Sequence, residues 1–179
     1  TLDKYEGDAI MAFWNAPVDQ DDHAYLCCLA ALDCVKHLKE VLHPRWKEAG
    51  KPLMDIRIGM NTGEMIVGNM GSKTRMDYTV MGDAVILGAR LESANKVYRT
   101  RIMMSEGTMR CMGGRIVSRE LDLIRVKGKV KPVRVYEVVA REGEVGAGVL
   151  EKLDLYAEGL ARYRGCEWQA GIDVFGKVL

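Results

Sequence analysis

The order of apolar and polar positions predicts alternating strands and helices along the chain. Its first stretch, residues 1–14, holds two apolar runs on either side of the dipeptide Gly7-Asp8. Glycine adopts the backbone angles that a tight turn needs, and aspartate is common beside it. We therefore expect a β-hairpin at the start of the chain, with the carboxylate of Asp8 displayed at its tip.

A long helix is predicted next. Apolar residues recur at spacings of three and four from Tyr25 to Leu42, which is typical of a helix with one buried stripe. The residues that suit its N-terminal cap and first turn are Asp19, Asp21 and Asp22. Pro44 and Gly50 mark the region where it ends, and the pattern leaves open whether the helix resumes through Trp46.

The middle of the chain combines period-two alternation with one further helix. Its expected strands are residues 53–60, 65–68, 77–80 and 101–104. The first two form a hairpin around a turn at residues 61–63, and residues 69–75 form a glycine-rich polar loop. A helix is predicted from Gly82-Asp83 to Val97, and Ser105 opens a short one.

The last part predicts an antiparallel strand pair and then helices. The pair covers residues 115–126 and 133–139, around a basic turn. We expect a domain over residues 1–140, a linker over 141–148 and a helical segment over 149–179. That segment either packs on the domain as a terminal helix pair or begins a tetratricopeptide-like repeat.

Composition narrows the class of protein. The 179 residues are 48% hydrophobic, enough for one cored domain with a small addition, and the net charge of +1 gives no bias toward nucleic acid or membrane surfaces. Five cysteines without CxxC spacing predict reduced, mostly buried thiols. No apolar run approaches the roughly 20 residues of a membrane span. We expect a cytoplasmic domain without direct nucleic-acid or membrane contact, and leave open whether the parent protein is membrane-anchored.

Three blocks of sequence carry a resemblance to a known family. Residues 1–14, 56–63 and 78–93 occur in the order and spacing of class III adenylate and guanylate cyclase catalytic domains, and the chain resembles these domains up to about Val138. The resemblance implies an α+β fold with a ferredoxin-like antiparallel sheet, helices on one face, and C-terminal helices. It also implies that the family's first strand, first helix and first metal-binding aspartate belong before Thr1.

The resemblance also assigns site residues. Asp8 matches the family's second metal-binding aspartate, which holds Mg²⁺ or Mn²⁺. Lys4 and Thr79 match the two positions that read the base, and Arg90 matches the transition-state arginine. A triphosphate-binding lysine is implied in the basic turn, and we assign it to Lys127.

These assignments favour ATP as substrate. A lysine can donate a hydrogen bond to adenine N1, and a threonine hydroxyl can accept one from the 6-amino group. The implied reaction converts ATP to 3′,5′-cyclic AMP and pyrophosphate with two divalent metal ions. It takes place at the interface of a homodimer or of two paired cyclase domains, with a sensory domain upstream.

One position departs from the family pattern. The family expects an asparagine that orients the ribose where this chain has Ile86, four residues before Arg90 and on the same helix face. Isoleucine has no hydrogen-bonding group, so two hypotheses stay open. The protein is an adenylate cyclase, or it is a weak or inactive cyclase-homology module that binds nucleotide or dimerises in signalling. The nearby Asp83 is interpreted as a helix-capping or dipole-compensating residue.

Overall fold

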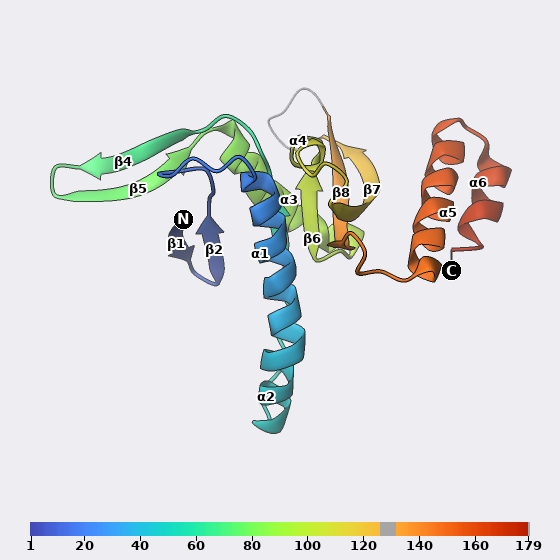
Figure 1. The fold of residues 1–179 in the computed structure, drawn as a ribbon, viewed down its shortest axis with the longest axis horizontal. Helices are drawn as coiled ribbons and strands as arrows, with labels where there is room; N and C mark the ends of the chain where they lie inside the picture. Colours follow the sequence, from blue (N-terminus) through green and yellow to red (C-terminus); the bar gives the residue numbers. More distant parts are fainter. Residues whose placement is uncertain (126–131, 179) are drawn as a thin grey trace.

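The computed structural model describes residues 1–125 and 132–178, and its elements alternate much as predicted (Figure 1). The strands are β1 (Leu2–Glu6), β2 (Ala9–Ala12), β3 (Ile58–Met60), β4 (Ile66–Ser72), β5 (Arg75–Met81), β6 (Ile102–Ser105), β7 (Ile116–Ile124) and β8 (Val133–Arg141). The helices are α1 (His23–His37), the π-helix η1 (Leu38–Leu42), α2 (His43–Glu48), α3 (Asp83–Tyr98), α4 (Glu106–Arg110), α5 (Ala147–Arg164) and α6 (Trp168–Phe175). None of these helices is long and apolar enough to cross a membrane.

A four-stranded mixed sheet in the order β3-β6-β8-β7 forms the centre. Strand β3 runs parallel to β6, and the other neighbours are antiparallel. The predicted hairpin between residues 53–60 and 65–68 is therefore wrong, because β3 pairs with β6 and β4 pairs with β5. The predicted loop at 69–75 is also wrong: β4 and β5 pair without interruption from Ile66↔Met81 to Ser72↔Arg75, so ladder hydrogen bonding outweighs the glycine content. This β4–β5 hairpin projects away from the central sheet (Figure 1).

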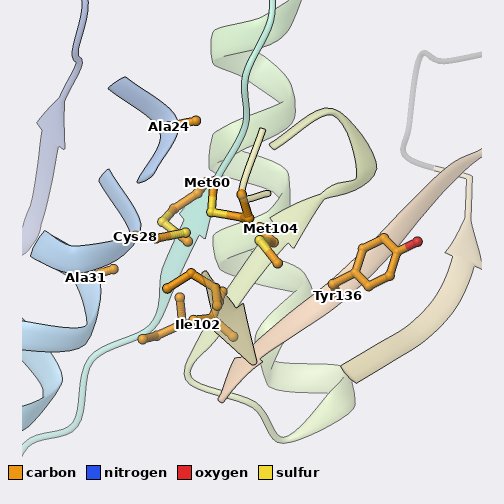
Figure 2. Packing of buried hydrophobic residues seen from close by; sticks show 10 residues of the cluster. Ala24, Cys28, Ala31, Met60, Ile102, Met104 and Tyr136 are labelled. Carbon is orange, nitrogen blue, oxygen red and sulfur yellow. The ribbon is translucent and has the colours of Figure 1, made fainter. Parts of the chain in front are cut away.

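Helices cover both faces of the central sheet, and not one face as the resemblance implied. Figure 2 shows Cys28 and Ala31 of α1 beside Met60 and Met104 on one face. On the other face, Leu87 and Leu91 of α3 pack with residues that include Met103. Neighbouring residues of a strand point to opposite faces, and Met103 and Met104 are both fully buried, so both faces need a covering helix.

The contact between α3 and β3 depends on a glycine. A Cβ atom on Gly59 would lie 2.1 Å from the backbone nitrogen of Glu92 and 2.3 Å from the carbonyl oxygen of Gly88. Only a residue without a side chain lets the helix backbone approach the strand this closely. The buried amide of Asn95 secures the same contact, because its Nδ2 donates to the carbonyl oxygen of Ile58 at 3.0 Å.

The long helical segment after the first hairpin lacks the expected capping bond at its start, and the structure answers the question that the pattern left open at its end. Asp22 occupies the N-cap position of α1 without a capping hydrogen bond, and its carboxylate instead accepts one from Arg115 at 2.7 Å. At the other end, helical structure continues past Pro44, and the π-helical turn η1 leads directly into α2. Pro44 lies in the first turn of α2, where a missing N–H is tolerated.

The C-terminal helices α5 and α6 form an antiparallel pair beside β7. Tyr156 contacts Phe175 at 5.6 Å between ring centroids, and the guanidinium of Arg119 lies 4.6 Å from the centre of the Tyr156 ring. Arg164 pairs with Glu120 of β7. These contacts join α5 to the sheet, and kinship with a tetratricopeptide repeat stays a prediction.

The cysteines do not follow the prediction of mostly buried thiols. Cys28 is buried and Cys27 partly so, but Cys34, Cys111 and Cys166 are exposed, and all five are free. Burial raises the pKa of Cys27 and of Cys28 to about 12. The neighbouring thiol of Cys27 also contributes to the raised pKa of Cys28.

This arrangement predicts selective alkylation. The thiolate is the reactive form, so iodoacetamide at pH 8 is expected to modify the three exposed cysteines of the native protein and spare Cys27 and Cys28. Peptide mass spectrometry of native and denatured samples measures this directly. Rapid modification of Cys28 in the native protein would contradict the packing of α1 on the sheet.

Candidate functional site

The tip of the β1–β2 hairpin displays Asp8. The register pairs Glu6 with Ala9, which leaves Gly7 and Asp8 as a two-residue turn. Gly7 has φ +64°, a left-handed conformation that glycine adopts without strain. Asp8 is exposed and has no hydrogen bond or ion pair among the described residues, so its carboxylate is available to a ligand.

The same hairpin brings Lys4 close to Thr79, although 75 positions separate them. Thr79 Oγ1 donates a hydrogen bond of 2.6 Å to Asp3 Oδ2, and Lys4 Nζ lies 3.6 Å from Asp3 Oδ1. Phe13, at the end of the hairpin, is buried and contacts the Tyr78 ring of β5 at 6.0 Å between centroids. The two predicted base-reading residues therefore meet around one carboxylate.

Sequence reasoning missed the residue at the centre of this group. The side chain of Asp3 is only 1% exposed, and its Oδ1 atom has no hydrogen-bond partner among the described residues. The sequence offered one signal: an acidic residue, Asp3, stands directly before Lys4 in the predicted first strand. Its contact with Thr79 depends on how β1 packs against β5, which periodicity does not report.

Helix α3 presents Arg90 and Ile86 on one flank. Leu87 and Leu91 face the sheet and are buried. The residues directly before them, Ile86 and Arg90, therefore lie at the side of the helix, next to its buried face. Ile86 is 50% exposed, and Arg90 is partly buried without a hydrogen bond or ion pair among the described residues. Both side chains are thus available to a ligand or to a second domain.

The start of α3 is held by a polar network. Asn61 donates to the carbonyl oxygen of Ala84 at 2.9 Å and accepts from Ser105 at 2.6 Å. A cavity of about 400 Å³ adjoins this network and is lined in part by Asp83 and Glu106. Asp83 lies in the first turn of α3, where its charge complements the helix dipole, while Gly82 is the N-cap residue.

Asp8 is the predicted metal ligand and Lys127 the predicted phosphate ligand. His, Cys, Asp and Glu side chains form no cluster of three or more that could hold a metal ion within residues 1–125 and 132–178. Mg²⁺ is commonly bound by one or two carboxylates together with substrate phosphates, so the exposed Asp8 fits one part of such a site. Lys127 lies outside the described residues.

Residues 4–140 match the family model of the adenylate and guanylate cyclase catalytic domain. The chain belongs to this class III cyclase family. The cyclase domain is 35% identical over 139 residues to adenylate cyclase 1 of Rhizobium meliloti, which covers 78% of this chain and 21% of that protein. It is 32% identical over 178 residues to the terminal-differentiation-specific adenylate cyclase of Dictyostelium discoideum, covering 97% of this chain and 8% of the relative. The chain therefore spans a small part of these curated relatives.

Solved structures show the same fold. The adenylyl cyclase CyaB from P. aeruginosa is 37% identical, with a TM-score of 0.73 over 82% of this chain and 74% of that one. The guanylyl cyclase Cya2 is 31% identical, with a TM-score of 0.70 over 82% of this chain and 73% of that one. The similar structures thus include both adenylyl and guanylyl cyclases, so membership of the family does not decide which base this cyclase domain reads.

Proposed function

We propose that this domain is an adenylate cyclase that converts ATP to 3′,5′-cyclic AMP and pyrophosphate between two cyclase domains. The observation that carries the proposal is the meeting of Lys4 and Thr79 at Asp3, with 2.6 Å between Thr79 Oγ1 and Asp3 Oδ2. Lys4 offers a donor and Thr79 a hydroxyl oxygen, which suit N1 and the 6-amino group of adenine. Guanine presents the opposite pattern on the same edge.

The other side chains supply binding and charge stabilisation. Arg90 can hold phosphate oxygens as negative charge develops, because a guanidinium presents several donors in a fixed plane. Asp8 would hold Mg²⁺ or Mn²⁺. Such an ion, when bound, lowers the pKa of the ribose 3′-hydroxyl and neutralises phosphate charge.

Exposed apolar side chains support pairing of two domains. The projecting β4–β5 hairpin exposes Ile66, Met76 and Met81 by 71%, 63% and 58%. Exposed apolar side chains gathered on one arm are typical of a protein-protein interface. A homodimer, or a pair with another cyclase domain, would cover these residues and bring Asp8 of one domain toward Arg90 of the other.

The second candidate function is a cyclase-homology module with little or no catalysis, and Ile86 favours it. This side chain is half exposed on the flank of Arg90 and offers no group that could orient a ribose. Loss of one orienting contact lowers a rate substantially, because reacting groups must be held in line.

A cyclase assay of the protein that carries this domain, beside an Ile86→Asn variant, tests both functions. We expect cyclic AMP formation from ATP and Mn²⁺ by the unaltered protein, and about a 10- to 100-fold higher kcat in the variant, since an oriented polar contact is regained. Ile86→Val, which adds no polar group, is the matched control and should leave kcat nearly unchanged. Activity confined to the asparagine variant would refute the adenylate cyclase function and support the module.

A further inference from the structure

Asp3 has an unusual environment for a carboxylate. Its side chain is 1% exposed, yet one oxygen accepts a single hydrogen bond from Thr79 and the other accepts none among the described residues. Burying a charged group is costly unless it is paired, and here Lys4 Nζ at 3.6 Å supplies the compensating charge. A leucine or valine at this strand position would be buried without that cost. A carboxylate here therefore costs stability, and we infer that it serves a function.

A β-bulge in β1 directs the side chain of Asp3 toward Thr79. Leu2 pairs with Ala12 and Lys4 pairs with Met11, so Asp3 is the extra residue on β1. Bulges re-aim side chains and are common beside active sites. Without the bulge, strict alternation along β1 would place Asp3 and Lys4 on opposite faces, and they would not share one ion pair.

The hydrogen bond controls what Thr79 can offer to a ligand. A threonine hydroxyl has one proton and two lone pairs, and it rotates to donate or to accept. An ionised carboxylate only accepts, so the proton of Thr79 is directed to Asp3 Oδ2 at 2.6 Å. The hydroxyl oxygen is left with lone pairs alone, which accept from an amino group and repel a carbonyl oxygen.

We propose that Asp3 is a positioning residue that sets base selectivity by directing the hydroxyl proton of Thr79 and holding Lys4 as the neighbouring donor. The inference deepens the proposed function and rests on its assignment of Lys4 and Thr79 to the base. Lys4 then donates to N1 of adenine, and the Thr79 hydroxyl oxygen accepts from its 6-amino group. Guanine places a donor at N1 and a carbonyl oxygen at C6, so it is mismatched at both positions.

The test measures binding of 3′-deoxy-ATP and 3′-deoxy-GTP, which cannot be cyclised, to the protein that carries this domain. We expect the unaltered protein to prefer the adenine nucleotide, and Asp3→Asn to reduce that preference by about 10- to 100-fold, the effect of one or two ordinary hydrogen bonds. Glu6→Gln, an exposed carboxylate on the same strand, is the matched control and should keep the preference. If Asp3→Asn does not fold, Asp3→Ser also removes the charge within a smaller volume.

A double-mutant cycle distinguishes positioning from a general structural effect. In a Thr79→Val background the hydroxyl is absent, so Asp3→Asn should change the adenine preference by less than about threefold, as coupled residues do. An unchanged preference in Asp3→Asn, or no preference in the unaltered protein, would overturn the proposal. Because binding is measured without turnover, a protein that makes no cyclic AMP but shows this pattern would refute the cyclase function and leave the selectivity role of Asp3 intact.

Discussion

Replacing Arg90 with alanine is expected to lower kcat for cyclic AMP formation by about 100- to 1,000-fold, the range for losing one preorganised group that stabilises transition-state charge. Arg90 is partly buried on α3 and has no hydrogen bond or ion pair among the described residues, so its removal breaks no described contact of the fold. The loss should fall on kcat and kcat/KM alike, because the contact is made in the transition state. Initial rates with ATP and Mn²⁺ measure both constants.

The matched control is Lys96→Ala, which removes an exposed cation from the same helix. Its kcat should stay within about twofold of the unaltered protein, as for surface substitutions away from a site. If Ile86→Asn proves to be the more active form, the comparison is made in that background. Equal rates for Arg90→Ala and Lys96→Ala would contradict the assignment of Arg90 to the reaction.

Replacing Gly59 with alanine is expected to destabilise the domain by about 3 kcal/mol or more, because the new methyl group would overlap backbone atoms. Its Cβ would lie 2.1 Å from the nitrogen of Glu92 and 2.3 Å from the oxygen of Gly88. Neither atom belongs to a flexible side chain, so α3 must move off the sheet. The melting temperature should fall by about 6–12 °C for a chain of this size. Thermal unfolding followed by circular dichroism measures this fall.

Gly68→Ala provides the control, since Gly68 is also a strand residue and nothing lies within 4 Å of a Cβ atom built there. Its melting temperature should stay within about 2 °C of the unaltered protein, the range of a neutral surface change. Similar melting curves for the two variants would show that α3 does not approach β3 through Gly59. Because Arg90 is carried by α3, a folded Gly59→Ala protein should also lose activity.

Elements set by local pattern could be predicted from the sequence. The hairpin at Gly7-Asp8, helix α3 and the pair β7–β8 lie where apolar spacing and turn residues indicate. Two predictions failed because a distant partner decided the structure. Strand β3 pairs with β6 rather than with the nearby β4, and Asp22 binds Arg115 rather than capping its own helix.

The candidate site divides in the same way. Asp8, Lys4, Thr79 and Arg90 were named as candidates through the resemblance of their blocks of sequence to the cyclase family, and their roles stay predictions. Asp3 could not be found in this way, since its burial depends on a bulge in β1 and its partner lies 76 residues away.

The sequence by itself determined the alternation of strands and helices, the family resemblance and the side chains available for chemistry, because these depend on residue type and short-range spacing. Only the tertiary structure decided which strands pair, which face each helix covers and which carboxylate joins Lys4 to Thr79. Those features depend on contacts between distant segments, whose energies come from packing and from the pairing of buried polar groups. Such contacts cannot be predicted from the pattern of neighbouring residues alone.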